Sequence, residues 1–118
     1  MLSFHQGWFW VAVISTGVVG LWGLALGVSK TTAPRAFLYA RSAALLAMAI
    51  QVSAGLILYA QGRRPGNDFH IFYGIVITFT FAFAYIYRIQ LQRRSELGYG
   101  LLLLFVMGLG LRAWANVV

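Results

Sequence analysis

Residues 7–28 read GWFWVAVISTGVVGLWGLALGV and contain no charged side chain. A helix rises about 1.5 Å per residue, so about 20 apolar residues cross the roughly 30 Å of hydrocarbon in a bilayer. Three further predominantly apolar stretches follow, at about 36–59, 70–87 and 97–115. The sequence therefore predicts an all-α integral membrane protein, a single domain over residues 1–118 with four transmembrane helices in an antiparallel bundle.

The composition is typical of a membrane protein. Hydrophobic residues make up 61% of the chain and charged residues only 9%, which reverses the balance of a soluble domain. The chain has no cysteine, which excludes disulfides, cysteine-ligated iron–sulfur clusters and c-type haem attachment. The net charge of +7 lies mainly beside the predicted helices, where it indicates contact with anionic lipid headgroups rather than nucleic-acid binding.

Short basic connections separate the predicted helices, at Lys30–Arg35, Arg63–Asp68 and Arg88–Glu96. Asn67 or Asp68 can cap the third helix, because a side-chain oxygen accepts the unpaired amide protons of a first turn. Six basic residues flank the first and third connections, namely Lys30, Arg35, Arg41, Arg88, Arg93 and Arg94. The opposite side has three, namely Arg63, Arg64 and Arg112. The positive-inside rule thus predicts that both termini are extracytoplasmic.

Two histidines are predicted to lie at a similar depth on one membrane face. His5 is at the outer end of the first helix and His70 at the outer end of the third, and odd-numbered helices run in the same direction. Two imidazoles from different helices can hold one haem iron, which makes haem b a candidate cofactor. They can also hold copper or zinc with Asp68 as a third ligand. A quinone headgroup bound by His70 with Tyr73 or a nearby arginine is a further interpretation, and ordinary interfacial histidines beside the aromatic residues 8–10 are the alternative.

A polar layer is predicted inside the membrane around Gln51. Counting from the helix ends places Ser15, Thr16 and Thr78 at nearly the same depth. An amide in hydrocarbon needs partners, so these four residues are predicted to form a structural clasp between helices, with a ligand or quinone site as the alternative. No acidic residue lies inside a predicted helix, which disfavours a small transporter.

Glycines predict where helices approach closely. Gly20, Gly23 and Gly27 in the first helix and Gly108 in the fourth are the predicted contact positions, with Gly23 and Gly27 at GxxxG spacing. Glycines are numerous on these two helices for an isolated bundle. They therefore favour contact with another membrane subunit or with a second copy of the chain.

One part of the chain is similar to known haem-binding membrane proteins. Gln51-Val-Ser-Ala-Gly55, Gly62-Arg63 and His70-Ile-Phe-Tyr-Gly74 lie within residues 51–74. This stretch resembles the outer end of small four-helix cytochrome b561-like and haem A synthase-like bundles. Members of these families use histidines on their helices to bind haem, and act as electron carriers or haem-modifying enzymes. The resemblance implies that His70 is a haem ligand, with His5 as its partner.

Two functional hypotheses follow. The first is a small non-catalytic accessory subunit of a larger energy-converting or electron-transport membrane complex, in contact with lipids and with other subunits or a second copy. The second is a single-haem b-type electron carrier, or a quinone-interacting protein, that uses His5 and His70. No catalytic residues are predicted, and no nucleic-acid partner is expected.

Overall fold

The computed structural model describes residues 2–93 and 95–116, which form helices joined by short connections and contain no strand. Its helices are α1 Leu2–Val28, α2 Arg35–Ala60, α3 Asp68–Ile86, α4 Arg88–Arg93 and α5 Ser95–Ala115. Four of these, namely α1, α2, α3 and α5, are long and apolar enough to cross a membrane. The predicted all-helical fold with four candidate spans is therefore confirmed.

Two predicted helix boundaries were wrong, and both errors have a local cause. α1 begins at Leu2 rather than Gly7, because the polar residues ahead of Gly7 lower the hydropathy without breaking a helix. His5 therefore belongs to a helix and has a fixed direction. The predicted loop Arg88–Glu96 is largely the short helix α4. This segment contains no glycine or proline that would stop helix formation.

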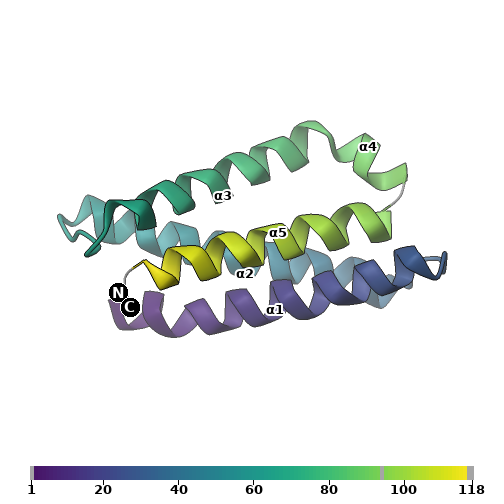
Figure 1. Cartoon of the computed structure of the whole chain (residues 1–118), viewed down its shortest axis with the longest axis horizontal. Helices are drawn as coiled ribbons and strands as arrows, with labels where there is room; N and C mark the ends of the chain where they lie inside the picture. Colours follow the sequence, from purple (N-terminus) through teal and green to yellow (C-terminus); the bar gives the residue numbers. More distant parts are fainter. Residues whose placement is uncertain (1, 94, 117–118) are drawn as a thin grey trace.

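The four long helices lie along the longest axis of a molecule that measures 46 × 25 × 20 Å (Figure 1). Both chain ends and the α2–α3 loop lie at the same end of the molecule (Figure 1). α1 packs most extensively against α5 and next against α2, whereas α3 packs mainly against α5 and meets α2 at few points. α2 and α3 are therefore loosely joined, although they follow each other in the chain.

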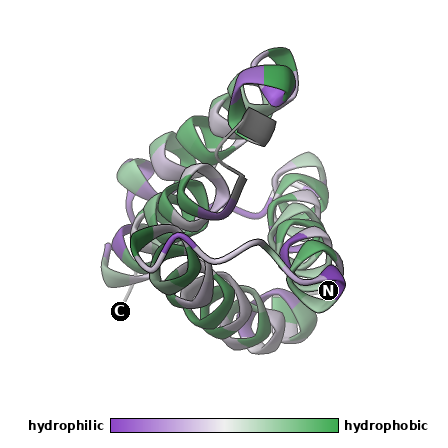
Figure 2. Ribbon diagram, turned by 90° about the vertical axis from the view of Figure 1, so that its right-hand side faces the viewer, coloured by the Kyte–Doolittle hydropathy of each residue, from purple (hydrophilic) through white to green (hydrophobic). Residues whose placement is uncertain are grey.

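Hydrophobic residues predominate all along the helices (Figure 2), and many of their large side chains are exposed. Val18, Leu46 and Phe79 are all more than half exposed, although they lie in the middle parts of α1, α2 and α3. A helix that is apolar all round is suited either to a large core or to lipid. The outer surface of this small bundle is thus of the kind that lipid covers.

The closest helix contact depends on glycines of α1. A Cβ atom at Gly23 would lie 2.7 Å from the carbonyl oxygen of Glu96 and 2.9 Å from Cα of Gly100, both on α5. Gly20 and Gly27 also face α5 at distances that leave no room for a side chain. The three predicted contacts on α1 are thus formed within the chain, and the surplus glycines of α1 do not indicate a partner subunit.

The predicted contact at Gly108 is not formed, since nothing lies within 4 Å of the place its Cβ would take. Gly100 has this role on α5 instead, because its own Cβ would lie 2.6 Å from the backbone nitrogen of Leu24. Hydropathy gives no information on which side of α5 faces α1, so the sequence could not separate these two glycines.

Candidate ligand site between two histidines

A cavity of about 1060 Å³ lies between the helices, with walls from α1, α2, α3, α5 and the α2–α3 loop. This volume is at the upper end of the range for small-molecule sites, about 300–1000 Å³. Its walls include exposed side chains of both α2 and α3, such as Leu56 at 69% and Phe79 at 70%. The cavity therefore opens sideways, between α2 and α3, which make few contacts with each other.

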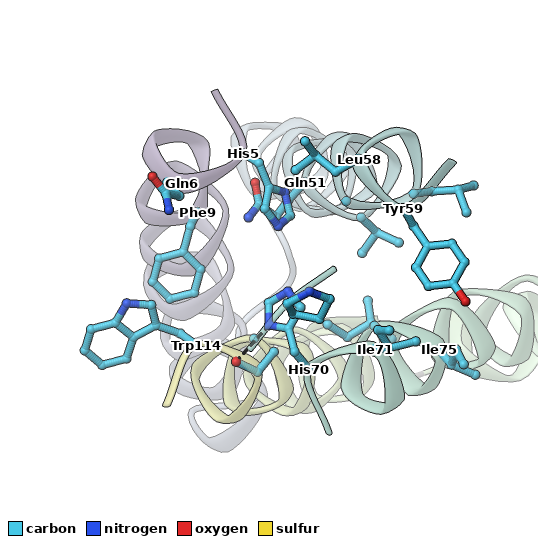
Figure 3. A pocket seen from close by; sticks show the side chains of 18 of the residues that line it. His5, Gln6, Phe9, Gln51, Leu58, Tyr59, His70, Ile71, Ile75 and Trp114 are labelled. Carbon is cyan, nitrogen blue, oxygen red and sulfur yellow. Dashed lines mark hydrogen bonds between the residues drawn. The ribbon is translucent and has the colours of Figure 1, made fainter. Parts of the chain in front are cut away.

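His5 and His70 face one another across this cavity (Figure 3). Their ring centroids are 6.0 Å apart, and the ring planes make an angle of 82°. His5 comes from α1 and His70 from α3, each in the first turn or just beyond it. The structure thus brings together the two residues that the sequence predicted as a pair.

The start of α3 fixes the position of His70. The side chain of Asn67 accepts a hydrogen bond from the backbone nitrogen of Phe69 at 2.8 Å, so the predicted cap is confirmed at Asn67. Nδ1 of His70 is 2.9 Å from the backbone oxygen of Ala113 on α5 (Figure 3). A carbonyl oxygen only accepts, so Nδ1 carries the proton and Nε2 of the neutral ring has a free lone pair.

His5 is held against one face of α2. The indole nitrogen of Trp8 donates to the backbone oxygen of Ala47 at 2.8 Å, which joins α1 to α2 one turn beyond His5. Ala47, Gln51 and Gly55 are four residues apart and share this face of α2. A Cβ at Gly55 would lie 3.0 Å from Cε1 of His5, so this glycine makes room for the imidazole ring.

Within the described residues, two buried polar atoms of the site have no hydrogen-bond partner: Nδ1 of His5 and Oε1 of Gln51. Gln51 is only 9% exposed and lines the cavity. An unsatisfied buried polar group costs about 1–3 kcal/mol, so native proteins rarely keep one without a reason. The unpaired atoms therefore indicate that this part of the cavity wall has a role besides packing.

Two other predicted ligands do not join the histidines. The hydroxyl of Tyr73 accepts a 3.4 Å hydrogen bond from Nε of Arg112, and Tyr73 does not line the cavity. The structure thus does not bring Tyr73 to the two histidines. Among residues 2–93 and 95–116 no group of three histidine, cysteine or acidic side chains could hold a metal ion, so Asp68 does not complete a zinc or copper site.

The predicted polar layer is not joined by hydrogen bonds between helices. Ser15 and Thr16 each donate to the carbonyl of Ala12, in their own helix. Thr78 donates to Gly74, also within its helix, and is exposed. Of the four residues in the layer, Gln51 alone has a buried polar atom that lacks a partner within the described part of the chain.

The mouth of the cavity is basic, and the arginine that the sequence offered as an alternative partner of His70 is represented there twice. Arg63 and Arg64 of the α2–α3 loop line it together with Tyr59. The guanidinium of Arg64 lies 3.7 Å over the Tyr59 ring, and its Nη1 donates to the Tyr59 backbone oxygen at 2.7 Å. An arginine pair close before His70 in the sequence was the available signal for an anion-binding rim.

No protein-family model matches this chain, and no curated protein or solved structure is significantly similar to it. The chemistry of the site therefore has to be inferred from its own residues.

Proposed function

We propose that this chain is a multi-pass membrane protein in which His5 and His70 bind one haem b as axial ligands, and that it carries single electrons. The observation that carries the proposal is the pair of opposed imidazoles, 6.0 Å apart between centroids, on two walls of a ligand-sized cavity. The four candidate spans support the membrane location.

The spacing of the two rings suits a single iron between them. A bond from a metal to an imidazole nitrogen is about 2 Å long, so two such bonds in line, with the half-width of each ring added, separate the centroids by about 6 Å. The angle of 82° between the ring planes is compatible with this arrangement, because each imidazole can rotate about its own iron–nitrogen bond.

The surroundings of the pair also suit a haem. Its macrocycle needs an apolar slot, and apolar side chains of α1, α2 and α3 line most of the cavity. Its propionate groups need cations near water, and Arg63 and Arg64 are exposed at the rim. The apolar slot thus matches the apolar macrocycle, and the basic rim matches the negatively charged propionates.

The choice of electron transfer follows from the number of ligands. A haem iron with an imidazole on each side has no open position for oxygen or a substrate, and exchanges one electron. An electron carrier works with a donor and an acceptor, so a place in a larger electron-transport assembly is part of this proposal. A purely structural subunit leaves the opposed histidines and the unpaired atoms beside them without a role.

An absorption spectrum of the protein, expressed with added haem precursor and purified in mild detergent, tests the proposal. We expect a Soret band, the α and β bands of a six-coordinate low-spin haem on reduction, and one haem per chain by the pyridine haemochrome assay. A colourless protein that also takes up no haem in titration would rule out this function.

Single cysteines test the proposed orientation, because the native chain has none. We expect Gly66→Cys in the α2–α3 loop to react with an impermeant maleimide in intact cells, and Thr32→Cys in the α1–α2 loop to react only after lysis. Both positions are exposed, so access to the reagent depends on the side of the membrane. The opposite labelling pattern would mean that the termini are cytoplasmic.

A further inference from the structure

The two unpaired polar atoms of the site are complementary. Nδ1 of an imidazole can donate a hydrogen bond and Oε1 of an amide can accept one. His5 and Gln51 lie beside each other on the same wall of the cavity (Figure 3). Both atoms are buried, so water does not offer either of them a partner.

We propose that Gln51 is the positioning residue of His5: its amide oxygen accepts the Nδ1 proton of His5 and thereby keeps the Nε2 lone pair for the ligand. This inference rests on the proposed function, since it assigns Nε2 of His5 to the haem iron. Three rotatable side-chain bonds of Gln51 allow the contact to form without movement of α2.

The second histidine already has the equivalent arrangement. His70 is held through Nδ1 by the backbone oxygen of Ala113, which leaves its Nε2 free. A ligating histidine almost always donates its other ring nitrogen to such an acceptor, which fixes the tautomer and raises the basicity of the ligating nitrogen. With Gln51 in this role, both rings present the same nitrogen to the space between them.

The packing around His5 places its ring beside residue 51, whose backbone is itself within hydrogen-bonding reach of the imidazole. Gly55 lies under the ring, and the backbone oxygen of Ala47 is used by Trp8. Gln51 lies between these two positions on the same face of α2. An aliphatic residue of similar length at position 51 would fill the same volume but would remove the side-chain acceptor.

NMR of ¹⁵N-histidine-labelled protein without haem tests the contact directly, since the chain has only two histidines. We expect His5 to be in the Nδ1–H tautomer in the wild-type protein and in Gln51→Glu, which keeps an acceptor. In Gln51→Met we expect a shift toward the Nε2–H tautomer. His70 should not change in any variant, and Thr78→Val, which alters another polar cavity residue, should leave both histidines unchanged.

The haem-loaded protein provides a second measurement. We expect Gln51→Met to weaken haem binding roughly tenfold to a hundredfold and to raise the midpoint potential, because the ligand becomes less basic. Gln51→Glu should lower the potential, since a carboxylate accepts the Nδ1 proton more strongly. The change in potential with Gln51→Glu decides the question if Gln51→Met does not fold.

The outcomes separate this inference from the proposed function. An Nε2–H tautomer of His5 in the wild-type protein, or an unchanged tautomer in Gln51→Met, overturns the role of Gln51 even if haem binds. If the tautomer follows residue 51 as expected and no variant binds haem, the contact is supported and the haem function fails.

Discussion

Replacement of His70 by alanine is expected to abolish the six-coordinate haem spectrum. Loss of a residue that merely supports a metal ligand costs about 10- to 100-fold in affinity, so loss of the ligand itself should cost more than 100-fold. His5→Ala should have the same effect, because the two rings occupy opposite walls of one cavity. Haem titration of purified protein, followed by the Soret band, measures both.

Two controls make this result specific. Phe79→Leu changes an exposed side chain on the cavity wall far from the histidines and should keep the low-spin spectrum. Added imidazole should partly restore that spectrum in His70→Gly, since a small ligand can enter the space that the ring leaves. Full haem affinity in His5→Ala together with a low-spin spectrum would show that the ligands are elsewhere.

Gly23→Leu is expected to prevent stable folding although the chain still inserts into a membrane. The first atom of any side chain at this position meets backbone atoms of α5 at 2.7 Å and 2.9 Å, and backbone cannot move aside as a flexible side chain can. Separation of α1 from α5 would cost more than the about 1–3 kcal/mol typical of overpacking, because it breaks the most extensive helix contact of the molecule. Thermal unfolding in detergent measures the loss.

Gly7→Leu is the matched control for this prediction. It makes the same substitution in the same helix, at a glycine with nothing within 4 Å of its Cβ position. We expect it to unfold at nearly the wild-type temperature. Equal stability of Gly7→Leu and Gly23→Leu would mean that the close approach of α1 to α5 is not required.

The number of long apolar helices could be predicted from the sequence because hydropathy is a sum over neighbouring residues. The meeting of His5 with His70 was also within reach, since short connections make alternate helices run in the same direction. The position of a residue along its helix does not by itself decide what the residue contacts, however. The rotation of each helix about its own axis decides which residues face each other, and it depends on packing that a single sequence does not reveal.

Tyr73 and Thr78 illustrate the effect of helix rotation. The cavity follows the row His70, Gly74, Thr78 along α3, whereas Tyr73 lies on the side turned toward Arg112 of α5. Thr78 lines the same cavity as Gln51 but donates to its own helix. Serine and threonine hydroxyls readily bond to the carbonyl four residues earlier, so similar depth alone does not predict contact between helices.

Because α3 is weakly attached to the rest of the molecule, a ligand of the proposed site would help to hold it in place. Within the described residues α1 and α3 have no direct backbone packing, and α3 is joined to the rest mainly through α5. A molecule held by His5 and His70 connects these two helices across the cavity and closes a ring of contacts around it. Ligand binding then adds directly to the free energy of unfolding, by an amount that grows with the logarithm of free ligand concentration. The protein would thus be most resistant to unfolding when its cofactor is abundant, and α3 would be the first element to detach when the cofactor is scarce.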